Sequence, residues 1–399
     1  MQLKEVYNHE FLASLADVLL EVDKNFEKQK FLEKFEDQTW AQKELKQRMR
    51  AITNALGESL NQKDFSTQIE ILKKAAVKIP KNKNSGLALI IFPDFVEVFG
   101  ERQILKQVQD DDTGKLNPNK PNPNKLSHPE LVSGSVDILN ICLNALSFFT
   151  EFGSSEFAIR KFLKLNQSHT LTFFESWSKS KNHHIRRLAS EGCRPRLPWG
   201  EALQNFKKNP HDILPILENL KNDESAYVRK SVANNLNDIS KDNPEIILKI
   251  LTKWNEEDVD KSLIRHALRT LLKKGNKEAL KIIGIDCNNL SENFTIQTFA
   301  LQKAVINISQ NLMFDFILEN QAANNKIRLE YAVYFLRKNG THGKKIFQIT
   351  TKNFAKGVFK FTKKHAFRDM TTRKHNAGKH FISLVVNGVE FQKLQFDLI

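Results

Sequence analysis

The chain has 399 residues, 40% of them hydrophobic, which excludes an intrinsically disordered protein and is enough for two or three domains. The 61 Lys and Arg residues exceed the 46 Asp and Glu residues. The resulting net charge of +15 favours nucleic acid or an anionic membrane as partner, although a basic surface can also serve solubility alone. Three dispersed cysteines without a C-x-x-C pair indicate neither a disulfide framework nor a zinc site.

The location of the protein is predicted from its apolar stretches. The N-terminus lacks the apolar run of a signal peptide. The longest apolar stretch, Leu87–Phe92, is far too short to span a bilayer. We therefore expect a soluble cytoplasmic protein with no membrane partner.

The first hundred residues have a helical pattern that is then interrupted. Apolar residues recur at helical spacing in 9–23 and 40–56, and residues 67–78 also predict a helix. No apolar periodicity spans 101–140, and its segment Lys115–Lys125 contains three prolines, which remove backbone donors and bias their neighbours to extended forms. We expect helices that begin a superhelix, followed by an inserted, solvated loop over residues 101–140.

A repeat follows the loop. The motif Asn-Pro-x-x-Ile-Leu-x-Ile-Leu begins at Asn209 and again at Asn243, 34 residues later. This period predicts stacked helix pairs in a solenoid with a concave face, and each asparagine is a candidate N-cap followed by proline at the first helical position. Each copy leads into a basic segment, Tyr227–Lys230 and Leu263–His266, so positive charge would line the concave face. Upstream we expect helices at about 138–150, 154–166, 169–180 and 183–193.

The periodicity changes after residue 290. Residues 327–335 alternate strictly between apolar and other side chains, and so do residues 381–391. Asn387-Gly388 lies between two strand-like runs and is a turn signal. We expect short strands in an antiparallel β-sandwich of immunoglobulin size at 290–399, after a helical-repeat domain at 1–289.

One segment, NHHIRRLASEGCRPRLPWG at residues 182–200, combines histidines, arginines, a carboxylate and a tryptophan. Glu191 lies four residues after an arginine and shares its helical face, while a proline-broken loop carries Trp199. Asp238 follows the next basic pair, and Glu156 begins an upstream helix. Each also has a structural interpretation: a helix cap, an ion pair, a first-turn carboxylate, or packing of the loop.

Several long strings in this chain have a specific resemblance. EFGSSEFAIRKFL, HHIRRLASEGCRPRLPWG and VRKSVANNLNDISKDNP resemble the AlkC-type DNA alkylation-repair glycosylases, which are HEAT-like-repeat proteins related to the AlkD type. The early run from Trp40 to Met49 is also similar. The tail, with KHAFRDMTTRKHNAGKH and LVVNGVEF, resembles their C-terminal immunoglobulin-like domain. The resemblance covers nearly the whole chain except 101–140, where the family passes more directly to the FFTEFGSSEF helix.

The resemblance implies a glycosylase that removes cationic N-alkylated bases such as 3-methyladenine from duplex DNA. Its functional residues are acidic side chains and a tryptophan, which correspond here to Glu156, Glu191 and Asp238 as catalytic residues and to Trp199 as a lesion contact. The chemistry agrees, because a methylated purine is already positively charged and leaves an oxocarbenium-like sugar that a carboxylate can stabilise. No metal or nucleotide cofactor is needed.

Basic side chains are the candidate phosphate contacts. In the repeats they are Arg186, Arg187, Arg194, Arg229, Lys230 and Arg265, and in the β-domain Lys364, Arg368 and Arg373. Any of them can instead belong to a solvated face. We expect a monomer, because the damaged duplex has no symmetry that requires two subunits.

Two other functions use the same features. A non-catalytic HEAT-repeat protein that binds damaged or bent DNA would use the same basic row while its carboxylates are structural. A protein–protein scaffold would need an apolar concave groove, whereas this one is predicted to be basic.

Overall fold

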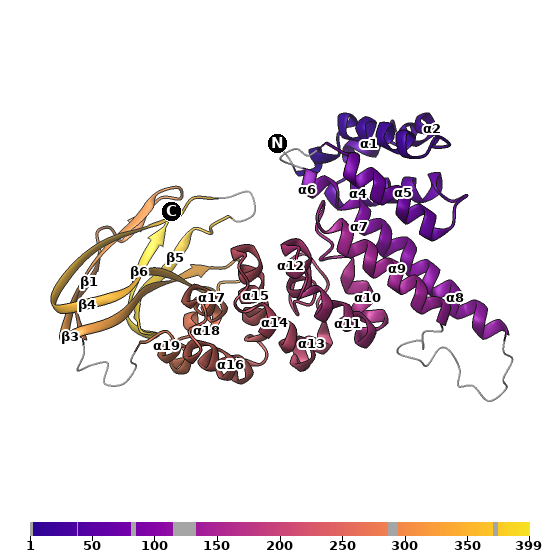
Figure 1. Cartoon of the computed structure of the whole chain (residues 1–399). Helices are drawn as coiled ribbons and strands as arrows, with labels where there is room; N and C mark the ends of the chain where they lie inside the picture. The colour runs from indigo at the N-terminus through magenta and orange to yellow at the C-terminus, as the bar shows by residue number, and fades with distance from the viewer. Residues whose placement is uncertain (1–2, 38, 81–84, 115–132, 286–293, 370–373) are drawn as a thin grey trace. The chain divides into compact units, whose positions relative to one another are not determined.

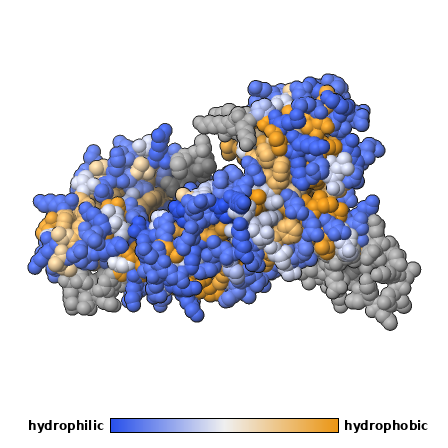
Figure 2. Space-filling view, in the orientation of Figure 1, coloured by the Kyte–Doolittle hydropathy of each residue, from blue (hydrophilic) through white to orange (hydrophobic). Residues whose placement is uncertain are grey.

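The computed structural model describes residues 3–37, 39–80, 85–114, 133–285, 294–369 and 374–399 (Figure 1). By packing, the chain divides into two compact units, Met1–Asn243 and Pro244–Ile399. Hydrophilic side chains cover most of the visible surface, and apolar side chains gather in places on the first unit (Figure 2). None of the described helices has the length and apolar content needed to cross a membrane.

The first unit is built from helices whose apolar faces pack on one another. Its helices are α1 His9–Val22, α2 Lys28–Glu33, α3 Thr39–Gln42, α4 Leu45–Ser59, α5 Phe65–Lys78, α6 Ser85–Ala88, α7 Ile91–Phe95, α8 Glu101–Gly114, α9 Ser133–Phe149, α10 Ile159–Leu165, α11 Gln167–Trp177, α12 His183–Glu191, α13 Gln204–Lys208, α14 Leu214–Leu220 and α15 Ala226–Ile239. Short 3₁₀ turns lie at Leu3–Tyr7 and His211–Ile213, and a π-helical turn, η2, spans Val96–Gly100.

Helix α12 packs against α15, and this contact places the site. Leu188 of α12 and Val228, Val232 and Leu236 of α15 are buried. The valines and Leu236 are four residues apart, so they form one apolar stripe along α15. Asn182 caps α12, because its side chain accepts from the backbone N–H of His184. This packing agrees with the predicted stacking of helices.

The expected loop over residues 101–140 is wrong at both ends. Helix α8 covers 101–114 and α9 begins at Ser133. The two helices pack together, with Ile104 and Leu139 fully buried, and this tertiary burial outweighs the weak periodicity of the sequence. The proline-rich part of the expected loop lies outside the described residues.

The two copies of the repeat begin differently. Helix α16 starts at Pro244, as predicted. Asn209 instead ends α13, and its side chain accepts from the N–H of His211 in the 3₁₀ turn that precedes α14. The proline in the first turn of α14 is Pro215, five residues after the predicted Pro210, because the 3₁₀ turn delays the start of the helix.

The second unit joins four described helices to a sheet. They are α16 Pro244–Glu256, α17 Lys261–Ala267, α18 Arg269–Lys273 and α19 Lys277–Ile282. The strands are β1 Phe294–Leu301, β2 Val305–Ile306, β3 Asn311–Leu336, β4 His342–Ala366, β5 Gly378–Val386 and β6 Val389–Leu398. The predicted boundary at 289/290 therefore lies near the change from helix to strand, whereas the division by packing precedes α16.

The sheet has the order β1-β3-β5-β6-β2, with β4 on β3. Two of its strands are not short as expected, because β3 and β4 have 26 and 25 residues and pair along almost their whole length. A register shift between Asn320 and Asn324 divides β3 into a part that pairs with β1 and a part that pairs with β5. Alternating apolar residues of both parts share one buried cluster, as in a sandwich.

The turn Asn387-Gly388 joins β5 to β6, as predicted, with φ of +49° and +81°. Such positive φ angles suit glycine and asparagine and form a hairpin turn. Gly388 lies directly against Gly275, which follows α18 and has a φ of +69°. A Cβ atom built on Gly388 would lie 2.5 Å from the Gly275 Cα, so the helical part and the sheet of this unit meet backbone to backbone.

Substitution of Gly388 by Ala should therefore lower the free energy of unfolding by about 2–4 kcal/mol, since it adds a backbone clash to a strained φ. Gly340→Ala is the matched control, because Gly340 has φ +77° and nothing within 4 Å of its Cβ position. The Gly340→Ala change should lower the free energy of unfolding by only about 1 kcal/mol. Urea-induced unfolding measures both, and equal losses in the two variants would contradict the close contact.

Candidate active site

Three predicted carboxylates come together within the first unit. Glu156 lies in the turn before α10, Glu191 is the last residue of α12, and Asp238 lies near the end of α15. The packing of α12 on α15 brings Glu191 and Asp238 to the two sides of Arg194. Helix stacking thus brings together acids that are more than 80 residues apart in the sequence.

Arg187 connects the first two acids. Its Nη1 lies 2.5 Å from Glu156 Oε2, and its Nη2 lies 3.6 Å from Glu191 Oε1. Its guanidinium also donates to Ser154 Oγ at 3.0 Å and lies 5.0 Å from the ring centre of Tyr227. Burial lowers the pKa of Arg187, but the two carboxylates more than offset this effect, so its pKa is raised and it stays charged.

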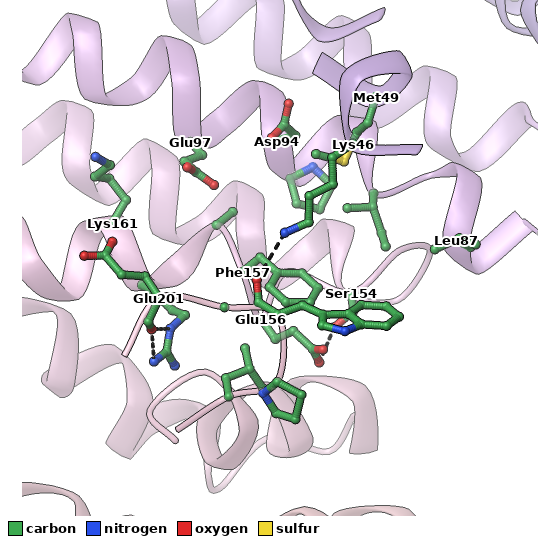
Figure 3. A pocket seen from close by; sticks show the side chains of 18 of the residues that line it. Lys46, Met49, Leu87, Asp94, Glu97, Ser154, Glu156, Phe157, Lys161 and Glu201 are labelled. Carbon is green, nitrogen blue, oxygen red and sulfur yellow. Dashed lines mark hydrogen bonds between the residues drawn. The ribbon is translucent and has the colours of Figure 1, made fainter. Parts of the chain in front are cut away.

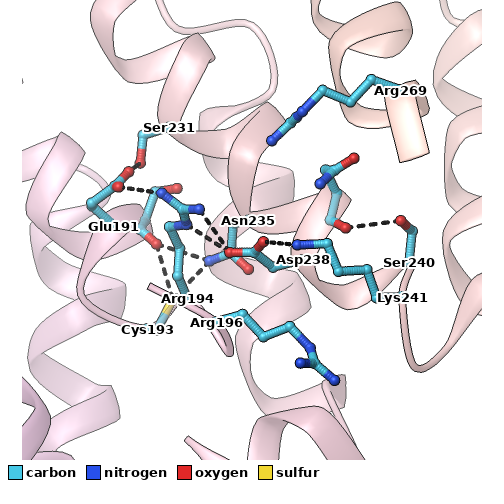
Figure 4. Close-up of polar contacts among 12 residues, drawn as sticks. Glu191, Cys193, Arg194, Arg196, Ser231, Asn235, Asp238, Ser240, Lys241 and Arg269 are labelled. Carbon is cyan, nitrogen blue, oxygen red and sulfur yellow. Dashed lines mark hydrogen bonds and ion pairs between the residues drawn. The ribbon is translucent and has the colours of Figure 1, made fainter. Parts of the chain in front are cut away.

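Arg194 connects the second and third acids (Figure 4). It donates from Nη1 to Glu191 Oε1 at 2.5 Å and from Nε to Asp238 Oδ2 at 2.8 Å. Lys241 Nζ donates to Asp238 Oδ1 at 2.9 Å. Burial lowers the pKa of Arg194, but Glu191 and Asp238 outweigh it and raise the pKa overall.

These six residues form an alternating series of opposite charges, which we call the ion-pair chain: Glu156, Arg187, Glu191, Arg194, Asp238 and Lys241. Its two inner acids are removed from solvent, with Glu191 5% and Asp238 1% exposed. Buried charges persist only when they are paired and hydrogen-bonded. The ion-pair chain therefore fixes the acids in place before any ligand arrives.

Glu156 differs from the other two acids. Both oxygens of Glu191 and Asp238 are occupied, the second oxygen of Glu191 by the Ser231 hydroxyl at 2.6 Å. Arg187 and Ser154 both contact Oε2 of Glu156, so within the described residues its Oε1 has no hydrogen-bond or ion-pair partner. Glu156 is the carboxylate that can still accept a ligand.

Trp199 is held in the open. Its residue is 75% exposed and has φ +64°, a left-handed conformation that is unusual for a tryptophan. Lys46 donates from Nζ to its carbonyl at 3.1 Å (Figure 3). The high exposure of the indole argues against the alternative that Trp199 only packs the proline loop, and its contact with a lesion stays a prediction.

Arg160, which sequence reasoning did not select, positions the loop that carries Trp199. It is buried, donates from Nη1 to the carbonyls of Gly192 at 3.1 Å and Arg194 at 2.8 Å, and also donates to the carbonyl of Glu201. Burial lowers its pKa to about 10, so it remains charged at neutral pH. The sequence pattern does not distinguish this buried arginine from the half-buried lysines Lys161 and Lys164 that follow it.

A cavity of about 590 Å³ opens beside these residues. Glu156, Glu191 and Trp199 line it, whereas Asp238 does not. Its other side is formed by α4, α7 and η2, and includes Asp94 and Glu97 (Figure 3). Burial raises the pKa of Asp94, and burial together with Asp94 raises the pKa of Glu97 to about 7.

The predicted phosphate contacts separate into two groups. Arg187 and Arg194 belong to the ion-pair chain. Arg186 is buried and donates to both oxygens of Asp223, at 2.6 and 3.0 Å, so the structure gives it an internal partner instead of a free surface. The exposed or half-buried candidates are Arg229, Lys230, Arg265, Lys364 and Arg368, while Arg373 lies outside the described residues.

Fold and site together define a helical-repeat protein with an acidic, tryptophan-flanked cavity and a C-terminal immunoglobulin-like domain. Residues 150–271 match the family described as "DNA alkylation repair enzyme", and residues 295–399 match "Uncharacterised protein YhaZ, C-terminal Ig-like domain". The chain is 37% identical to the uncharacterized protein YhaZ of Bacillus subtilis (strain 168), over 99% of both chains.

A solved structure is similar over the whole chain. It is the Pseudomonas fluorescens alkylpurine DNA glycosylase AlkC bound to DNA containing an abasic site analog, with a TM-score of 0.84, 33% identity and 100% coverage of both chains. This chain therefore belongs to the AlkC-type family of DNA alkylation repair proteins.

The ion-pair chain makes a prediction about stability. Replacing Arg194 by Met removes the shared partner of two buried acids, so that Glu191 keeps only Arg187 and Ser231 and Asp238 keeps only Lys241. This loss should lower the free energy of unfolding by about 3–5 kcal/mol. Arg196→Met is the matched control, because Arg196 pairs with Asp242 at a solvent-exposed site and should contribute less than about 1 kcal/mol. Urea-induced unfolding compares them; similar effects of the two changes would argue against a buried network.

Glu97 makes a prediction about pH. Its pKa is raised from 4.5 to about 7, so the folded protein binds its proton more tightly and wild-type stability should fall as pH rises from about 5 to 8. In Glu97→Gln this pH dependence is absent, so the stability of the variant relative to wild type should rise by roughly 2 kcal/mol over that interval. The rise is smaller than the whole pKa shift would give, because the cavity is open to water and solvent screens the charge.

Asp242→Asn is the control for the pH experiment. Arg196 holds the pKa of Asp242 below its usual 3.8, so this group is ionised throughout pH 5–8 and its loss should not change the slope there. Unfolding free energies measured at several pH values test both variants. An unchanged slope in Glu97→Gln would contradict the raised pKa.

Proposed function

We propose that this protein is a monofunctional DNA glycosylase, which excises cationic N-alkylated bases such as 3-methyladenine from duplex DNA by hydrolysing the N-glycosidic bond. The observation that carries the proposal is that Oε1 of Glu156 has no partner among the described residues and lies beside the same cavity as the exposed indole of Trp199. The similarity to an alkylpurine DNA glycosylase solved with DNA supports it. The protein would act in the cytoplasm as a monomer.

The chemistry needs little acid catalysis. As the bond between C1′ and the base nitrogen breaks, its electron pair stays with the cationic base, which leaves neutral, and positive charge develops on the sugar. Glu156 would stabilise that charge and accept the proton of the water that attacks C1′. Glu191 and Asp238 would act by fixing Arg187 and Arg194, and with them Glu156, in the required orientation.

Trp199 would contact the lesion. An aromatic face attracts a cation by about 1–2 kcal/mol when the site is desolvated, and a methylated base is such a cation. Of the described basic residues, Arg229, Lys230, Arg265, Lys364 and Arg368 are the proposed phosphate contacts, with binding that weakens steeply as salt is raised.

A binding module without catalysis is the second candidate. Specific support for it comes from the ion-pair chain, since neither Glu191 nor Asp238 keeps an unoccupied oxygen. Such a protein would recognise damaged or bent duplexes and leave the base attached. Release of a free base distinguishes the two candidates.

The test uses purified protein and DNA treated with a methylating agent. We expect release of free 3-methyladenine above the spontaneous rate, and Glu156→Gln should reduce the rate about 10²–10³-fold while keeping DNA affinity, because a preorganised charge is lost from the transition state. Glu151→Gln is the matched control, since Glu151 is exposed in the same turn region. No release by the wild type removes the enzyme proposal and favours the binding module.

A further inference from the structure

The cavity extends well beyond the acid and the indole. Its volume of about 590 Å³ exceeds what a single purine ring system fills, and it continues from Glu156 and Trp199 to a second wall formed by α4, α7 and η2. Glu97 and Asp94 lie on that wall, opposite Glu156 (Figure 3). The proposed hydrolysis uses only the side at Glu156, so the second wall has no assigned role.

The lining between the two walls suits a flat heterocycle. Met49, Ile90 and Phe157 contribute to a surface that is mostly apolar. Small-molecule sites typically combine such apolar walls with a few polar groups that set orientation. A purine has this character, because its faces are apolar and its edge carries hydrogen-bond donors and acceptors.

Glu97 is the polar group of the second wall with unused capacity. Asp94 already accepts from Arg50 at 2.8 Å and from Thr53 at 2.6 Å. Within the described residues the side chain of Glu97 has no hydrogen-bond partner, and Glu97 lies in the π-helical turn η2, a feature that is frequent at functional sites. The charged groups near it are Asp94, Arg50, Lys161 and Glu101.

The carboxyl group of Glu97 can both donate and accept hydrogen bonds near neutral pH, since its pKa is raised to about 7 by burial and by Asp94. An adenine-type base presents an amino donor beside a ring-nitrogen acceptor, which matches a protonated carboxyl group. After excision the alkylated base is neutral, so it no longer requires an ionised partner.

We propose that the cavity is a product site, which takes up the released N-alkylpurine base between its apolar walls and binds the edge of the base at Glu97. This inference rests on the proposed glycosylase function. Uptake would remove the base from the position beside C1′ and leave Glu156 and water facing the sugar.

The experiment measures binding of free 3-methyladenine to the full-length protein without DNA, by calorimetry and by quenching of tryptophan fluorescence. Glu97→Gln keeps a donor and an acceptor and should bind within about threefold of wild type, whereas Glu97→Leu should bind at least about tenfold more weakly. Met49→Trp fills the cavity without changing charge and should also abolish binding. Thermal unfolding of each variant confirms that it is folded.

Glu70→Leu is the control, because Glu70 lies on α5 in an exposed pair with Lys73 and outside the cavity lining. Base release from methylated DNA without measurable binding of the free base would overturn the product site and leave the glycosylase proposal intact. Equal binding by Glu97→Leu and wild type would also overturn it. Binding of the free base by a protein that never excises it would overturn the role as a product site.

Discussion

Two arginines, the half-buried Arg187 and the buried Arg194, determine the geometry of this site. Each lies between two carboxylates that come from different helical segments, and each is charged because its acids outweigh the effect of burial. The attraction works in both directions, since a charge removed from water is stable only when an opposite charge compensates it. The same ion pairs therefore stabilise the packing of α12 on α15 and hold the acids in place, so a change in one alters the other.

The loop after α12 is positioned by a second set of charges that act on the backbone. Arg160 donates to three carbonyls of this loop, and Lys46 donates to a fourth, that of Trp199. Hydrogen bonds to four carbonyls restrain the backbone of this loop, including that of Trp199.

Sequence reasoning predicted the architecture because two signals were strong. The 34-residue repeat and the strict alternation after residue 290 both arise because each helix or strand buries one apolar face, and this burial produces a periodicity that can be read in the sequence. It failed at α8, where buried contacts with α9 form a helix that weak periodicity does not reveal. It also overestimated the number of short strands, because β3 continues through a register shift that no local residue pattern indicates.

For the site, the sequence predicted residue types better than roles. The three acids were found through a resemblance, and the structure brings them together. Which oxygens remain unoccupied depends on partners such as Ser231, 40 residues from Glu191, and no spacing rule predicts that. Arg186 illustrates the opposite error, since a basic residue next to Arg187 points to Asp223 instead of a surface.

The left-handed backbone at Trp199 bears on how this protein can be improved in the laboratory. Glycine adopts that conformation without strain, so a change to glycine would relieve roughly 1 kcal/mol or more of local strain in the native state. Selection for heat tolerance alone would then tend to discard the aromatic ring. A library screened for robustness should keep this position fixed, because thermostability and the proposed lesion contact are opposed there.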